Sequence, residues 1–357
     1  MERDVCMKRM SKVIFTFVLV LSLVLSLAGC FSSKTKEGTS TKQLVDTKNE
    51  KERSGEIKRF TIGTAGTAGA LYPMGVAMAE CISNHVEGFS ATGEATAASV
   101  ENLRNLHNGK LGWAISQTEI ASMAYYGKGD YTQSRYEDIR ALYSTIYNYL
   151  QVFVAGDSPI DSIEDFKGKI IGVGAAGSGG EMAARALLEV YGLTYKDIKP
   201  QFMPESEAVS ALKDGKIDGF IATHPLKSAA MVDLTTSMKA KLLPIEKDEF
   251  YKENPAYSRY TVEAGTYNHI DQPIVIPRSR IIMCTSTNVD FSDEDIYLMV
   301  KAIWENRDEW ANSNASVGSQ VILETALDEI DIPLHPGAIR YYQEIGMEIN
   351  PSLIPKD

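Results

Sequence analysis

Residues 60–73 read Phe-Thr-Ile-Gly-Thr-Ala-Gly-Thr-Ala-Gly-Ala-Leu-Tyr-Pro, an apolar start followed by a loop rich in glycine and threonine. The start predicts a strand, and the periodic apolar residues after the loop predict a helix from Tyr72 to Val86. Backbone N–H groups at such a helix start form an anion site, and the hydroxyls of Thr64 and Thr67 add hydrogen-bond donors. The alternative interpretation is a plain tight turn of an α/β fold.

A second glycine-rich loop covers residues 172–180 and reads Gly-Val-Gly-Ala-Ala-Gly-Ser-Gly-Gly. It lies between an expected strand at 169–173 and an expected helix at 181–191. Three of its glycines match the pattern GxGxxG, so a dinucleotide site has to be weighed. That site needs an acidic residue at a strand end about 20 residues further on, and Asp197 lies in a polar stretch instead. We therefore favour an anion site at Ser178 and the helix start over a Rossmann site.

Short strands alternate with amphipathic helices along the rest of the chain, which predicts α/β layers. The unit of strand, glycine-rich loop and helix occurs twice, at Ile62 and at Val173. Each unit precedes a strand with a polar end, Ser116-Gln117 in the first and Thr223-His224 in the second. This repetition predicts two facing lobes, rather than one sheet, with a ligand cleft between them. His224 is a candidate donor to a ligand, the alternative being a partly exposed loop residue.

The remaining elements follow from periodicity and capping signals. Ser99 is expected to be the N-cap of a helix. The long apolar strand at 273–286 would return the chain to the first lobe. Further expected strands cover 111–115, 150–155 and 217–222, and further expected helices cover 120–126, 163–166, 205–213 and 293–312.

The N-terminus carries the pattern of a lipoprotein signal peptide. Lys8, Arg9 and Lys12 precede an apolar run at 13–28, which ends in Leu-Ala-Gly-Cys at Cys30. We expect cleavage before Cys30 and lipidation of its thiol. The alternative, an uncleaved membrane anchor, would need about 20 apolar residues. Residues 31–59 contain few apolar side chains, which predicts a flexible tether.

Charge and cysteine content exclude several classes of function. The formal charge of −11 becomes −13 once residues 1–29 are removed, and no basic stripe offers a nucleic-acid surface. Cys81 and Cys284 are expected as small buried hydrophobes, with a disulfide between them left open. The spacings of Cys and His predict no metal site and no cofactor. The sequence shows no GxSxG motif and no spacing that ties Ser, His and Asp together, so we expect no enzyme.

Several short motifs in a fixed order resemble the TAXI family, the extracytoplasmic solute receptors associated with TRAP transporters. The resemblance runs from Phe60 to about Met347. Its residues are 62–69 with Tyr72-Pro73, Ser99-Val100-Glu101-Asn102-Leu103, 163–169 with the Gly-Ser-Gly loop, Asp214-Gly215-Lys216-Ile217-Asp218-Gly219, and Leu334-His335-Pro336-Gly337-Ala338. The sequence departs from the family at Ala65, Ala68 and Ala97-Ala98, where family members are richer in glycine, and at Leu71, where they have an extra tyrosine.

The resemblance implies a two-lobed type II periplasmic-binding-protein fold with a ligand cleft between the lobes. The expected organisation is a signal peptide at 1–29, a tether at 30–58, lobe I at 59–149 with 272–347, and lobe II at 150–271. The residues expected to line the cleft are Gly63, Thr64, Gly66, Thr67, Gly69, Tyr72, Ser99, Gln117, Gly177, Ser178 and Gly179, with His224 added from its position.

The function implied is capture of a small carboxylate or amino acid outside the cell. Glutamate, glutamine and 2-oxoglutarate are the ligands that the resemblance suggests, with delivery to TRAP membrane subunits. The expected location is extracytoplasmic, lipid-anchored to the membrane, either in a periplasm or on the outer face of the cell membrane. Two alternatives remain, a ligand-sensing receptor for a signalling partner and a secreted enzyme.

Overall fold

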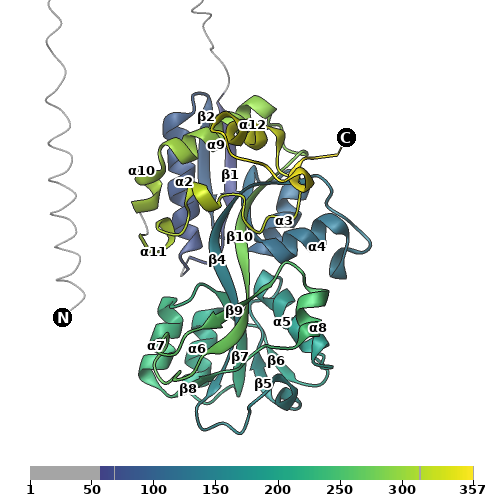
Figure 1. The fold of residues 1–357 in the computed structure, drawn as a ribbon, viewed down its shortest axis with the longest axis vertical. Coiled ribbons are helices and arrows are strands. Elements are labelled where there is room, and N and C mark those ends of the chain that lie inside the picture. The colour runs from purple at the N-terminus through teal and green to yellow at the C-terminus, as the bar shows by residue number, and fades with distance from the viewer. Residues whose placement is uncertain (1–56, 68, 313–314, 357) are drawn as a thin grey trace, which may run out of the picture. The chain divides into compact units, whose positions relative to one another are not determined.

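Two long strands, β4 (Ile139–Ala155) and β10 (Ile274–Ser286), pair antiparallel along the centre of the computed structural model (Figure 1). The structure describes residues 57–67, 69–312 and 315–356. The predicted signal peptide and Cys30 lie outside these residues, as does all of the predicted tether except residues 57 and 58.

Within the described residues, β4 and β10 belong to one ten-stranded sheet with the order β2-β1-β3-β10-β4-β7-β5-β6. β8 pairs with β4, and β9 pairs with β10. The prediction of two lobes rather than one sheet is wrong in this respect, because β4 and β10 join the strands of both ends. The other strands are β1 (Lys58–Gly63), β2 (Phe89–Glu94), β3 (Trp113–Gln117), β5 (Ile170–Gly172), β6 (Lys199–Gln201), β7 (Gly219–His224), β8 (Ala240–Leu242) and β9 (Ser258–Val262).

The elements gather in two groups at the ends of β4 and β10 (Figure 1). We call lobe I the group with β1–β3 and the C-terminal helices, and lobe II the group with β5–β9. Lobe I contains α2 (Leu71–His85), α3 (Ser99–His107), α4 (Thr118–Tyr126), η1 (Gly129–Tyr131), α9 (Asp293–Glu305), α10 (Arg307–Ala311), α11 (Ala315–Gly318), η4 (Leu323–Thr325), α12 (Pro336–Glu344) and η5 (Pro351–Leu353). Lobe II contains η2 (Ile163–Phe166), α5 (Gly179–Val190), α6 (Glu205–Lys213), α7 (Ala229–Ser237) and α8 (Asp248–Glu253). The predicted boundary at 149/150 falls inside β4, and the boundary at 271/272 falls just before β10.

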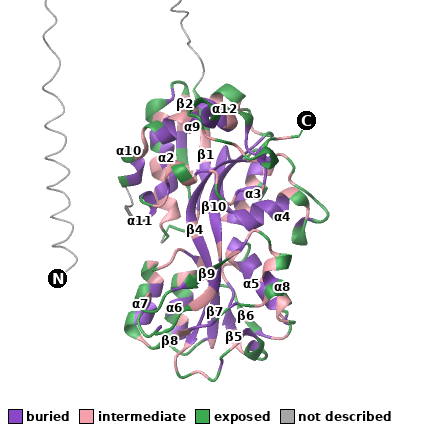
Figure 2. Cartoon of the chain, in the orientation of Figure 1, coloured by how far each residue is buried: buried purple, intermediate pink, exposed green. Residues whose placement is uncertain are grey.

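Helices cover both faces of the sheet in each lobe, so the strands are the most buried part of the fold (Figure 2). In lobe I, one core lies under α2 and α9, and another lies under α3 and α4. In lobe II, α5 and α8 cover one face, and α6 and α7 cover the other. The amphipathic periodicity seen in the sequence therefore follows from burial of one stripe of each helix against the sheet.

The structure confirms the prediction that Cys81 and Cys284 are small buried residues. Cys81 and Cys284 are both buried and free, which answers the open question of a disulfide between them. Trp113, Trp304 and Trp310 are also buried. No helix among the described residues is both long and apolar enough to span a membrane.

Two element predictions were wrong in extent. β4 begins at Ile139, well before the expected strand at 150–155. The single helix expected at 293–312 divides into α9 and α10, because Asn306 leaves helical geometry with φ −111° and ψ 28°. Arg307 then donates to the carbonyl of Val321, which holds the second segment in its new direction.

Candidate functional site

The side chain of Gln117, at the end of β3 in lobe I, reaches across to lobe II. In one orientation, its amide group forms hydrogen bonds with four neighbouring residues. The oxygen accepts from Thr223 Oγ1 at 2.6 Å and from Asn148 Nδ2 at 3.0 Å, and the nitrogen donates to Gly179 O at 3.3 Å and to Glu119 Oε1 at 3.1 Å. A buried amide with this many partners holds the carboxyl end of β3 against the carboxyl end of β7 and the start of α5. The two lobes are therefore in contact at this point.

Ser99 belongs to the same contact, although the prediction that it is the N-cap of α3 is wrong. Ala98 is the N-cap and Ser99 is the first helical residue. Ser99 Oγ accepts from the backbone N–H of Gln117 at 3.0 Å. A Cβ added to Gly179 would lie 2.8 Å from Ser99 Oγ and 2.5 Å from the end of the Gln117 side chain. Glycine at 179 thus permits the close approach of α5 to lobe I.

Ala98 has a backbone conformation that alanine rarely adopts. Its φ is 67° and its ψ is −143°, close to a region populated almost only by glycine. Strain of this kind costs of the order of 1–3 kcal/mol and is concentrated at functional sites. The conformation explains why glycine would suit the segment before α3, where this chain has Ala97-Ala98.

Replacing Ala98 with glycine is expected to raise the free energy of unfolding by about 1 kcal/mol, because relief of strain outweighs the extra chain entropy of glycine. Thermal or urea unfolding of the Ala98→Gly variant measures this. The matched control is Ala97→Gly, because Ala97 is not among the described residues with positive φ. That control should lose stability, and equal losses in both variants would contradict the assignment of strain to Ala98.

The start of α5 has the geometry expected of an anion site. Ser178 is the N-cap, and its Oγ accepts from the backbone N–H of Glu181 at 3.1 Å. The other first-turn N–H groups of a helix have no partner within the helix. Gly177 beside them is exposed, with φ 73°. The loop therefore leaves backbone donors at the positive end of a 12-residue helix.

The first loop divides into a buried part and an exposed part. Thr64 is fully buried, and its Oγ1 donates to the carbonyl of Glu94 at 2.7 Å, so its hydroxyl proton is already engaged. Gly63 packs closely, since an added Cβ would lie 2.7 Å from Asn102 Oδ1. By contrast, Gly66, Thr67 and Gly69 are exposed, and a Cβ added to Gly66 would meet nothing within 4 Å. Tyr72 is half-buried in the first turn of α2.

His224 lies apart from the Gln117 contact, although it follows Thr223 directly. Successive side chains of a strand point to opposite faces, so Thr223 faces Gln117 and His224 faces away. His224 Nδ1 is 3.1 Å from Gln151 Nε2 and 3.0 Å from Pro225 O, and its buried Nε2 has no partner within the described residues. Thr223 is thus the residue of this pair that joins the lobes, and strand alternation is the signal that would have identified it.

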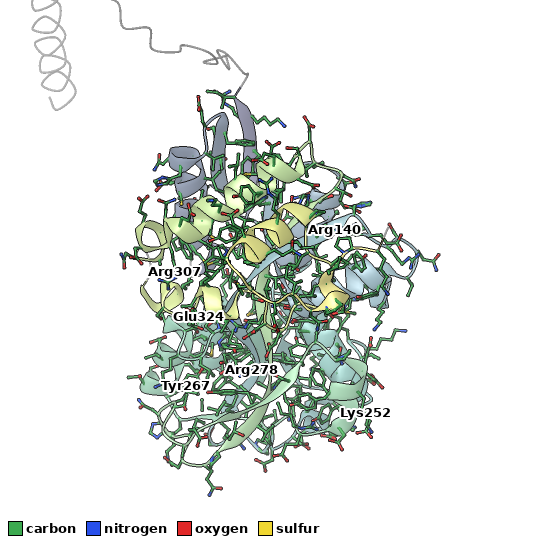
Figure 3. All side chains as sticks on the ribbon, turned by 45° about the horizontal axis from the view of Figure 1, so that its top comes forward. Arg140, Lys252, Tyr267, Arg278, Arg307 and Glu324 are labelled. Atoms are coloured by element: carbon green, nitrogen blue, oxygen red, sulfur yellow. The ribbon has the colours of Figure 1, made fainter. Side chains whose placement is uncertain are left out.

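Arg278 of β10 also joins the lobes, on the face of the sheet opposite to the Gln117 contact. Figure 3 labels Arg278 near the junction of the two groups of elements. Its guanidinium donates to Glu329 Oε1 at 3.0 Å and lies over the ring of Tyr147 at 4.4 Å. Glu329 belongs to the C-terminal segment of lobe I and has a positive φ of 56°. The interface between the lobes therefore has a charged contact on this face as well.

Glu119, in the first turn of α4, is a buried carboxyl group behind Gln117. It is 5% exposed, and Tyr257 of lobe II donates to its Oε1 at 2.6 Å. Burial raises the pKa of Glu119 to about 7, against the lowering effect of the hydrogen bond from Tyr257. Its Oε2 has no hydrogen-bond partner among the described residues. Sequence reasoning did not identify this group.

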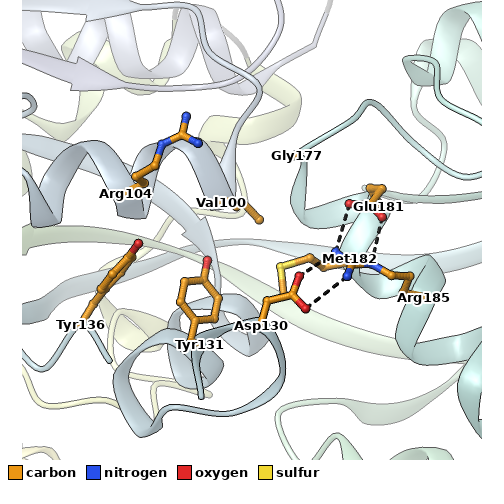
Figure 4. A pocket seen from close by; sticks show the side chains of 9 residues that line it. All are labelled: Val100, Arg104, Asp130, Tyr131, Tyr136, Gly177, Glu181, Met182 and Arg185. Atoms are coloured by element: carbon orange, nitrogen blue, oxygen red, sulfur yellow. Dashed lines mark hydrogen bonds and ion pairs between the residues drawn. The ribbon is translucent and has the colours of Figure 1, made fainter. Parts of the chain in front are cut away.

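A cavity of about 310 Å³ opens beside the start of α5, between the two lobes (Figure 4). Of the predicted site residues, Gly177 lines it. Among the described residues, no group of three or more His, Cys, Asp and Glu side chains is placed to hold a metal ion. The full lining consists of Val100, Arg104, Asp130, Tyr131, Tyr136, Gly177, Glu181, Met182 and Arg185.

Comparison with known proteins finds solute-binding proteins among the relatives. An Escherichia coli protein described as an aliphatic sulfonates-binding protein is 31% identical over 81 residues, which cover 23% of this chain and 25% of that relative. The match thus spans about a quarter of that protein's length. The alkanesulfonate-binding protein SsuA from Xanthomonas axonopodis pv. citri is 15% identical, with a TM-score of 0.44 over 82% of this chain and 92% of that one. A TctC solute-binding protein from Polaromonas is 15% identical, with a TM-score of 0.44 over 73% and 88%.

A family model covers most of the described structure. The match begins in β1, extends through both lobes, and ends just after α12. It therefore includes Gln117, the start of α5 and all residues that line the cavity. The chain belongs to the NMT1-like family, whose model matches residues 62–346.

Proposed function

We propose that this chain is an extracytoplasmic solute-binding protein that captures a small organic anion between lobes I and II and delivers it to a membrane transporter. The observation that carries the proposal is the contact of Gln117 with Thr223 and Gly179 at the N-terminus of α5. Polar side chains from both lobes meet there at helix amides that suit an anion. The chain passes between the lobes in β4 and β10, so bending of these strands would open and close the cleft.

The finer assignment is a TAXI receptor of a TRAP transporter, anchored by a lipid at Cys30. The ordered motifs quoted above support it. Its ligand would be a carboxylate such as glutamate, glutamine or 2-oxoglutarate. A sulfonate is the chief competitor, because the Escherichia coli relative is named for aliphatic sulfonates. Both acid groups present oxygen atoms to backbone N–H donors, so the start of α5 can bind either.

Isothermal titration of the protein with glutamate, glutamine, 2-oxoglutarate, butanesulfonate and glucose tests the proposal. We expect at least one of the acidic solutes to bind and glucose not to bind. The Gly179→Val variant should bind none of them, because its side chain would meet Gln117 and Ser99 where the lobes touch. Binding of glucose together with failure of every acidic solute would overturn the proposal.

A further inference from the structure

The cavity between the lobes has walls of two kinds. Apolar surface comes from three residues, which are Val100 of α3, Met182 of α5, and Tyr136 from the segment between η1 and β4. Arg104 of α3 and Tyr131 of η1 add polar groups on the side of lobe I (Figure 4). The volume of about 310 Å³ is at the lower end of the range for ligand pockets, roughly 300–1,000 Å³. The cavity therefore has the size of a small organic molecule.

Most of the charge around the cavity is already paired. Arg185 donates to Glu181 Oε1 at 2.9 Å and lies 2.8 Å from Asp130 Oδ2, so its charge is fully paired by two carboxylates. Arg104 is different, because it is exposed and its guanidinium makes no hydrogen bond or ion pair with any residue that the structure describes. An unpaired guanidinium at the edge of this cavity can bind an anion through charge-assisted hydrogen bonds.

Tyr131 supplies a second, independent indication of a ligand. Its side chain is 7% exposed, and its hydroxyl has no hydrogen-bond partner among the described residues. Figure 4 shows the ring in the wall of the cavity, with the hydroxyl turned toward α3, which carries Val100 and Arg104. Burial raises the pKa of Tyr131, so the hydroxyl keeps its proton and remains a donor. A buried donor without an acceptor is costly unless another molecule supplies the acceptor.

We propose that this cavity is a binding subsite for an organic anion with an apolar body. Arg104 and Tyr131 bind the acid group together, and the body lies against Val100, Tyr136 and Met182. The inference rests on the proposed function, since the cavity adjoins the α5 N-terminus at Gly177. Arg104 and Tyr131 then determine which ligands bind. The preferred ligand has an apolar part larger than that of glutamate or 2-oxoglutarate.

The test compares benzoate, hexanesulfonate, 2-oxoglutarate and uncharged benzyl alcohol by isothermal titration. We expect benzoate or hexanesulfonate to bind at least tenfold more tightly than 2-oxoglutarate, and benzyl alcohol not to bind. Arg104→Gln and Tyr131→Phe should each weaken the best probe at least tenfold, as expected for lost hydrogen bonds to a charged group. The matched control is Arg340→Gln, which removes the same charge from α12, where Arg340 pairs with Glu294.

The outcomes separate this inference from the proposed function. If an acidic solute binds but both variants retain its affinity, the subsite is wrong and solute binding stands. If 2-oxoglutarate binds more tightly than benzoate and hexanesulfonate, the apolar subsite is also wrong. If no acidic solute binds to the unmodified protein, the proposed function itself fails. Thermal unfolding of each variant shows whether it has folded, and Arg104→Gln and Tyr131→Phe provide two separate perturbations of one site.

Discussion

The Glu119→Gln variant is expected to be more stable than the unmodified protein at pH 8 by about 3 kcal/mol, because each unit of pKa shift corresponds to about 1.4 kcal/mol. Burial raises the pKa of Glu119 from 4.5 to about 7. Glutamine has nearly the same shape and keeps a carbonyl oxygen to accept the hydrogen bond from Tyr257. It removes the cost of placing a charge in the interior, and its amide nitrogen takes the place of Oε2, which has no hydrogen-bond partner among the described residues.

The pH dependence gives the sign of the effect. Because the pKa of Glu119 is higher in the folded state than in the unfolded state, the folded protein binds more protons between pH 4.5 and 7. Stability contributed by this group therefore falls as the pH rises through that window. Asp331 adds to the raised pKa, and the hydrogen bond from Tyr257 opposes it. Below pH 4.5 the unmodified protein and Glu119→Gln should be nearly equal in stability.

Urea unfolding at intervals from pH 4 to pH 8 measures the difference. The matched control is Glu80→Gln, which makes the same chemical change on the exposed face of α2. The free energy of unfolding of Glu80→Gln should differ from that of the unmodified protein by a nearly constant amount between pH 4.5 and 7. If Glu119→Gln and Glu80→Gln follow the same pH profile, the carboxyl group of Glu119 is not held in a buried, neutral form.

Local pattern predicted the helices well where one stripe of each faces a core. α6 has the bounds expected from the sequence, Glu205–Lys213, and α5 begins at Gly179, two residues before the helix expected at 181–191. β2 was not predicted, because Phe89–Glu94 lacks a continuous apolar run and is a strand through its pairing with β1. The early part of β4 was not predicted either. Its polar residues, such as Asn148, point toward the interface between the lobes, which local pattern does not reveal.

Only part of the candidate site could be predicted, because several of its contacts join residues that lie far apart in the sequence. The glycine loops and Gln117 stand at strand ends, a position that local pattern identifies. Thr223 and Tyr257 lie more than a hundred residues from Gln117 and Glu119, so their contacts depend on the closure of two lobes. Strain at Ala98 is also invisible locally, since alanine gives no sign of a glycine-like φ. Motifs therefore locate the loops, whereas the pairing between lobes needs the structure.

Replacing Asn102 with alanine is expected to destabilise the protein by about 3 kcal/mol, because each buried group that loses its partner costs about 1–3 kcal/mol. Asn102 is fully buried on α3. Its Nδ2 donates to Thr64 O at 2.8 Å and to Ile115 O at 2.9 Å, and its Oδ1 accepts from Thr96 Oγ1 at 2.7 Å. One side chain thus joins the end of β1, strand β3 and the segment before α3.

Comparison of Asn102→Ala with Asn102→Asp separates hydrogen bonding from packing. Aspartate preserves the volume but replaces the amide donor with an oxygen that faces two carbonyl groups, so it should lose at least as much stability as alanine. The control is Asn105→Ala on the same helix, where the side chain is half-buried and a loss below about 1 kcal/mol is typical. Urea unfolding measures all three variants. If Asn102→Asp is as stable as the unmodified protein, the amide donors do not hold the loop at Thr64. Packing of the side chain alone would then account for the stability.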